Sequence, residues 1–293
     1  MQNIIFLTIH IVFALGMFIS FKLVDVKGLN KFHTVFVNYI VAILLTLVDT
    51  DIALADFTDY YTAKLVLPSL IIGFLFVLNF ILILFSTNRV GLGLTTALNK
   101  MSVVIPVSVG IIYLGQESDI LQKILGITAA LLSFALILYQ KKGKVSPLSY
   151  ILPAMVFLIS GLIDTSMEMS GRFIISQSGE RELFLFGVFS TALIFSIVFS
   201  FADKILSEKK IKFSFNTVKI GVMMGVFNYL SSKMVLINVE RMGGSVVFPI
   251  HNASVVLITA LIGFFFFKEK FSIKQWTGII LAVISVAVIA STL

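Results

Sequence analysis

The sequence predicts an all-α membrane protein whose ten transmembrane helices form two inverted five-helix repeats. Three observations predict this fold class: the composition, ten long apolar runs and an internal repeat. Of the 293 residues, 58% are apolar and 13% are charged, whereas soluble domains are usually about 45–50% apolar and about 25% charged. Such a chain cannot cover a surface that faces water, so a soluble enzyme is excluded and the lipid bilayer is the expected partner.

The apolar runs have the length of helices that cross a bilayer. A transmembrane helix needs about 20 apolar residues, whereas the strands of an outer-membrane barrel appear as alternating segments of about 10. Each run is therefore predicted to be one helix, and the first is expected to be a retained span because neither a basic segment nor a cleavage site accompanies it. In chain order, the runs cover residues 4–21, 33–48, 65–86, 92–114, 121–139, 150–170, 183–201, 216–237, 243–267 and 273–293.

An internal repeat divides the chain into residues 1–141 and 142–293. A shift of 152 residues aligns the two parts without a gap from about residue 66 onward. Because each part holds five spans, an odd number, the second must enter the membrane upside down. Inverted repeats of this kind are typical of secondary transporters, whose substrate site lies near the midplane between the repeats. The rare residues that coincide are Arg89 with Arg241, Gly91 with Gly243 and Glu117 with Glu269.

The basic residues indicate an orientation and exclude several kinds of site. The loops after the odd-numbered runs carry 15 of the 22 Lys and Arg, and the opposite loops carry five. The positive-inside rule then places both termini outside the cytoplasm. Because the basic residues lie at the ends of runs and form no patch, we expect no nucleic-acid binding. With no Cys and three scattered His, we expect neither a metal site nor a cofactor, and no catalytic motif appears.

Short motifs before the fifth span of each repeat resemble those of the drug/metabolite transporter superfamily, EamA-like branch. They are Leu114-Gly115-Gln116-Glu117 and Phe267-Lys268-Glu269-Lys270, and the stretch from Asn99 to Pro106 also resembles one subgroup. The resemblance implies a transporter, more commonly an exporter, of amino acids, related metabolites or drugs. It also implies that both termini are cytoplasmic, opposite to the charge count. Pro106 and Pro249 stand at other distances from the glutamates than is usual in the family, so a helix bend is expected elsewhere.

Ionisable residues deep in a span are costly in lipid and indicate function. Lys100 lies eight residues into the fourth run, and the repeat places Asn99 and Lys100 opposite His251 and Asn252. We expect all four to line the cavity between the repeats, although Lys100 could also extend to the interface and His251 could be a packing residue. Asn79 and Asn228 are expected to line this cavity or to join helices.

Three titratable residues are candidates for proton coupling. Asp164 and Glu168 share one face of the sixth span, with Asp164 deeper and Lys100 as its candidate partner across the cavity. Glu168 is expected to pair with Arg172. His10, midway along the first span, nearly matches Asp164 under the repeat, and it too could be a packing residue. Four helix-end residues are assigned to capping, gating or ion pairs: Arg89, Arg241, Glu117 and Glu269.

The predicted function is therefore a secondary transporter of a small polar metabolite that works by alternating access. We expect a monomer or homodimer in the plasma (inner) membrane. The alternatives are a passive facilitator or channel, which would show continuous polar stripes, and an intramembrane lipid-handling protein, which would need a lateral opening.

Overall fold

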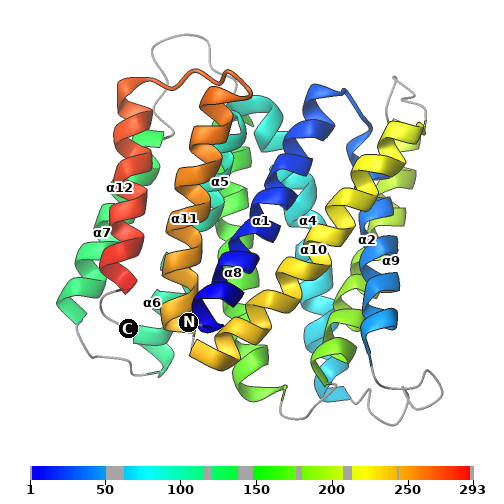
Figure 1. Cartoon of the computed structure of the whole chain (residues 1–293), viewed down its shortest axis with the longest axis horizontal. Coiled ribbons are helices and arrows are strands. Elements are labelled where there is room, and N and C mark those ends of the chain that lie inside the picture. The colour runs from blue at the N-terminus through cyan, green and yellow to red at the C-terminus, as the bar shows by residue number, and fades with distance from the viewer. Residues whose placement is uncertain are drawn as a thin grey trace.

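Helices make up nearly all of the computed structural model, which describes residues 2–50, 63–114, 120–137, 148–175, 180–206, 213–242 and 244–290. Figure 1 shows them as one bundle, with both termini at the same end. The described helices are α1 (Gln2–Val26), α2 (Lys31–Asp49), α4 (Ala63–Val90), α5 (Leu92–Met101), α6 (Val104–Leu114), α7 (Ile120–Ile137), α8 (Leu148–Phe173), α9 (Glu180–Leu206), α10 (Phe215–Met242), α11 (Gly244–Phe265) and α12 (Ile273–Ala290).

The predicted all-α membrane fold is confirmed. Within the described residues, seven helical segments are long and apolar enough to cross a membrane, and one of them, Leu92–Val109, runs through α5 into α6. Three shorter apolar segments lie in α7, α11 and α12. Large apolar side chains such as Val48, Leu67 and Ile194 stay exposed on the outside of the bundle, which suits a surface that faces lipid. A cluster of buried aromatic residues that includes Phe21, Phe80 and Phe189 fills the interior.

Helix contacts in the bundle come in equivalent pairs, in which each helix of one half is replaced by its counterpart in the other half. Under the predicted repeat, α1 corresponds to α8, α2 to α9, α4 to α10, α5 to α11 and α7 to α12. Helix α1 packs on α10 as α8 packs on α4, and α4 packs on α9 as α10 packs on α2. This is the pairing expected of two copies of one unit. The boundary after residue 141 lies outside the described residues, so the division into repeats stays a prediction.

The fourth span differs from its prediction as a single helix over residues 92–114. It breaks at Ser102 and Val103, between α5 and α6. Proline lacks an N–H group and cannot bond the carbonyl four residues before it, so Pro106 leaves the Ser102 carbonyl without its helical partner. The N–H of Ile105 donates to that carbonyl instead, at 2.9 Å. The corresponding span of the second half, α11, is continuous from Gly244 despite Pro249.

Candidate functional site

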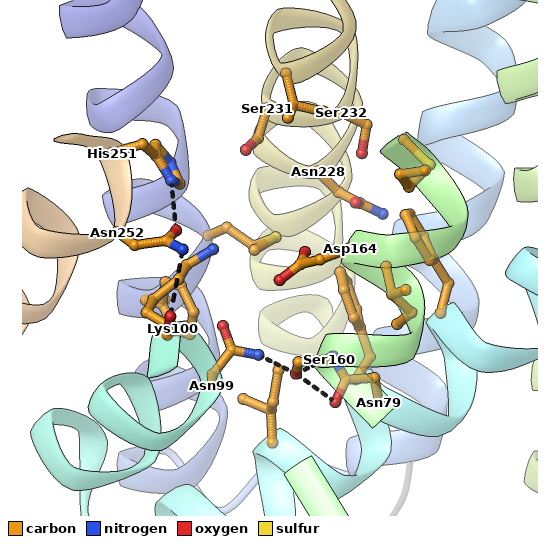
Figure 2. A pocket seen from close by; sticks show the side chains of 18 of the residues that line it. Asn79, Asn99, Lys100, Ser160, Asp164, Asn228, Ser231, Ser232, His251 and Asn252 are labelled. Carbon is orange, nitrogen blue, oxygen red and sulfur yellow. Dashed lines mark hydrogen bonds between the residues drawn. The ribbon is translucent and has the colours of Figure 1, made fainter. Parts of the chain in front are cut away.

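A cavity of about 120 Å³ lies where the two halves of the chain meet. A site of about 10–15 Å³ on the same measure holds one water molecule, so this cavity has room for a small solute. Six helices supply its walls: α1, α4, α5, α8, α10 and α11. Figure 2 shows polar side chains that reach into it from α5, α8, α10 and α11. All eight residues predicted for a cavity between the repeats line it: His10, Asn79, Asn99, Lys100, Asp164, Asn228, His251 and Asn252.

Lys100 and Asp164 are the charged side chains among the described residues that line the cavity. Asp164 comes from α8 and accepts a hydrogen bond from the Ser102 hydroxyl at 3.0 Å. Lys100 comes from the last turn of α5, and its ammonium lies 5.8 Å from the centre of the Phe18 ring. The two charges attract each other, yet no direct ion pair within 4.0 Å joins them. Lys100 thus lines the cavity, and both charges remain available to a ligand.

The break in the fourth span makes the Lys100 carbonyl available to a side chain of the second half. The Asn252 amide donates to it at 3.3 Å, and the Asn252 oxygen lies 3.1 Å from Nδ1 of His251. A carbonyl can only accept, so the amide nitrogen must face Lys100 and the amide oxygen must face His251. The oxygen in turn requires a proton on Nδ1, which leaves Nε2 as the acceptor of a neutral His251 ring.

His10 and His251 form a stacked pair that sequence reasoning missed. Their ring centres lie 4.0 Å apart and the ring planes differ by 16°. Nδ1 of His10 and Nε2 of His251 are buried without a hydrogen-bond partner. The repeat relates His10 to Asp164 and not to His251, so no sequence signal pointed to this contact between α1 and α11.

An amide network lines the wall formed by α4, α5 and α8. The Ser160 hydroxyl accepts from the Asn99 amide at 2.5 Å and from the Asn79 amide at 3.0 Å. Ser160 was missed by sequence analysis, although it stands one turn before Asp164 on the face already singled out. On α10, the Asn228 amide donates to the Asn38 oxygen at 3.2 Å. Asn79 and Asn228 thus both line the cavity and join helices.

The predicted helix-end residues are not gathered in one place. The Glu269 carboxylate accepts from the N–H groups of Leu92 and Gly93, at 2.6 Å and 3.1 Å. Arg241 places its guanidinium 4.4 Å from the Phe6 ring centre, and Arg89 is exposed at the end of α4. Glu117 and the side chain of Arg172 lie outside the described residues, so the predicted pair of Glu168 with Arg172 stays a prediction.

Lys233, the other Lys within a span, is held by acidic residues at the ends of two neighbouring helices. It pairs with Asp49 at the end of α2 and, at 3.6 Å, with Glu182 near the start of α9. Tyr229 also donates to Asp49. Among the described residues, no group of three or more His, Asp or Glu side chains could hold a metal ion.

Comparison with known proteins finds one family profile that matches the second half of the chain. The sequence profile of the EamA-like transporter family matches residues 154–291. The second half of this chain is EamA-like. The resemblance that the short motifs suggested is therefore confirmed, and the EamA-like match indicates a multi-pass membrane transporter. A search among curated proteins finds no match.

A solved crystal structure shares the fold over nearly the whole chain. It aligns with a TM-score of 0.62 at 11% sequence identity, covering 98% of this chain and 96% of the other. At so low a sequence identity, the match shows a shared fold and says nothing about a shared function. It does show that both halves, and not only the matched one, follow an architecture already seen in a crystal.

Proposed function

We propose that this chain is a secondary transporter of a small polar metabolite, such as an amino acid, that works by alternating access in the plasma (inner) membrane. The observation that carries the proposal is the pair of opposite charges, Lys100 and Asp164, on the walls of one cavity between the halves. Charges inside a membrane are costly unless they are paired or bind a ligand. Because these two are not in direct contact, a substrate that bridges them would satisfy both.

A substrate that carries an anionic and a cationic group suits this cavity best. The Lys100 ammonium would bind the anionic group, and the Asp164 carboxylate would bind the cationic group. One Asp164 oxygen already accepts from Ser102, which leaves the other oxygen for the substrate. Export is the direction that the family resemblance favours. Asp164 and His10 are the candidates for proton coupling because both line the cavity, and Glu168 lies one turn beyond Asp164.

The first experiment is a ligand-stabilisation screen of the purified protein against amino acids and related metabolites. A ligand at 100 times its dissociation constant stabilises the folded state by about 2.7 kcal/mol. Each hit is then tested for counterflow in proteoliposomes, where a carrier exchanges labelled for unlabelled substrate. We expect Lys100→Met and Asp164→Asn to reduce this exchange at least tenfold.

The matched control for these variants is Lys27→Gln, since Lys27 is exposed in the turn after α1 and should not affect exchange. Counterflow that is unchanged in Lys100→Met and Asp164→Asn would remove both residues from the substrate site. A screen with no hit among amino acids and related metabolites would contradict the proposed class of substrate.

A further inference from the structure

Helix α5 begins without a capping side chain of its own. Its N-cap position is Gly91, at φ 94°, and no side-chain cap comes from that residue. The first N–H groups of a helix need acceptors from outside the helix, and a carboxylate serves best because the N-terminus carries a partial positive charge. Glu269, from the turn between α11 and α12, supplies the acceptors for Leu92 and Gly93. The second half of the chain thus caps a helix of the first.

Two glycines, Gly91 and Gly263, leave room for the Glu269 carboxylate. A Cβ atom on Gly91 would lie 2.9 Å from the carboxylate, and one on Gly263 would lie 2.5 Å from it. Lys268 adopts a φ of 54°, and the N–H of Glu269 donates to the Gly263 carbonyl at 2.9 Å. This tight turn directs the side chain back onto α5.

An ion pair extends the contact to two more helices that line the cavity. The Lys22 ammonium of α1 lies 2.9 Å from the Glu269 carboxylate and 3.6 Å from Asp25. Asp25 in turn accepts from Asn88 of α4. The Glu269 and Lys22 side chains are only 8% and 12% exposed, so water screens this pair little. Glu269 therefore joins α1, α4 and α5 to the turn after α11.

Buried side chains lie between this contact and the cavity. Lys100 stands eight residues after Leu92, about 12 Å along a helix. In between, Thr95, Leu98 and Phe21 are fully buried, and the hydroxyls of Thr95 and Ser86 hydrogen-bond at 2.9 Å. The turn between α11 and α12 lies at the end of the bundle opposite the two termini (Figure 1).

We propose that Glu269, with Leu92, Gly93 and Lys22 as its partners, is a latch that keeps this end of the cavity shut, and that it releases the start of α5 when this end opens. The proposal rests on the proposed function, since only alternating access requires the end to open. Glu269 acts here as a positioning residue. Through α5 it also fixes the helix whose other end carries Lys100.

The native chain contains no cysteine, so the latch can be tested by thiol labelling. Thr95→Cys reports access from the latched end, and Ser231→Cys, on the cavity wall formed by α10, reports access from the other end. Each is labelled with a water-soluble maleimide in nanodiscs, with and without Glu269→Gln. Glutamine keeps an oxygen acceptor but loses the charge that faces Lys22 and the helix N-terminus.

We expect Glu269→Gln to raise the labelling rate of Thr95→Cys about tenfold and to lower that of Ser231→Cys. Glu240→Gln is the matched control because Glu240 pairs with Arg181 and is 67% exposed; it should alter neither rate. An increase at both cysteines would show that Glu269 only stabilises the fold, and unchanged rates would show that it holds no closed state. Either result overturns the latch. Because labelling needs no substrate, it can fail while counterflow succeeds, or the reverse.

Discussion

Gly91 offers a direct test of how closely the Glu269 carboxylate is held. In Gly91→Ala, the new Cβ would meet the carboxylate at 2.9 Å, closer than atoms of side chains normally approach. It would also place an L-residue at φ 94° and ψ 168°, a backbone region that is essentially reserved for glycine. The substitution therefore combines backbone strain with displacement of the cap.

The two effects have separable magnitudes. Backbone strain of this kind costs about 1–3 kcal/mol. Hydrogen bonds to a charged group contribute about 1.5–3 kcal/mol, and Gly91→Ala should lose them because the carboxylate must withdraw from Leu92 and Gly93. We therefore expect Gly91→Ala to lower the free energy of unfolding by roughly 2.5–6 kcal/mol. Gly28→Ala is the control, since Gly28 also has a positive φ of 59° but nothing lies within 4 Å of its Cβ position; it should cost only about 1–2 kcal/mol.

A double-mutant cycle separates the clash from the strain. Glu269→Ala already lacks the carboxylate, so adding Gly91→Ala to it should cost the strain alone. The two single losses should then exceed the loss of the double variant by about 1.5–3 kcal/mol. Denaturant titration in detergent micelles, followed by helical circular dichroism, measures each free energy of unfolding. Additive losses would refute the reasoning, because Gly91→Ala would then act without displacing Glu269.

Three further predictions concern the cavity and its surroundings. Asn252→Leu removes the donor to the Lys100 carbonyl and the acceptor for His251, so the counterflow affinity should fall about tenfold; an unchanged affinity would contradict a fixed His251 tautomer. Pro106→Ala restores an N–H that can bond the Ser102 carbonyl, so it should straighten the fourth span and slow exchange while the midpoint of thermal unfolding is kept. Pro249→Ala, in the continuous α11, is the control and should leave the exchange rate unchanged. Lys233→Met should lower the free energy of unfolding by only about 1 kcal/mol in denaturant titration, because the Asp49 carboxylate of its closer pair is 37% exposed; a loss above about 3 kcal/mol would contradict this.

The spans could be predicted because lipid leaves few alternatives to long apolar helices. The break in the fourth span could not, since the run over residues 92–114 is apolar on both sides of it. The presence of a proline does not by itself predict where a helix breaks. Pro68 and Pro153 lie inside continuous helices, each at the sixth residue of its helix. Pro106 stands nearer the middle of its span, and the break at Ser102 and Val103 lies within one turn before it.

The cavity residues could be predicted singly but not in their contacts. Polar side chains such as Lys100 and Asp164 are conspicuous in an apolar span because of their cost in lipid. Which side chains meet depends on how helices distant in the sequence pack. The repeat did not relate His10 to His251, so it could not predict that the two rings stack. Ser160 was missed because a serine costs little in a helix and is common in spans. Glu269 was assigned to a helix end, but the end that it caps belongs to the other half.

Contacts between polar groups join the two halves of the chain at several depths. Asn252 reaches Lys100, Asp164 accepts from Ser102, Asn228 reaches Asn38, and Glu269 caps α5. Apolar side chains pack against lipid almost as well as against each other, so helix association in a membrane depends on close packing and on hydrogen bonds. The hydrogen bonds therefore select which faces of the two halves meet. If the halves move relative to each other during transport, these same bonds must exchange partners, and a substrate that bridges Lys100 and Asp164 would alter the balance between the two arrangements because it binds them differently.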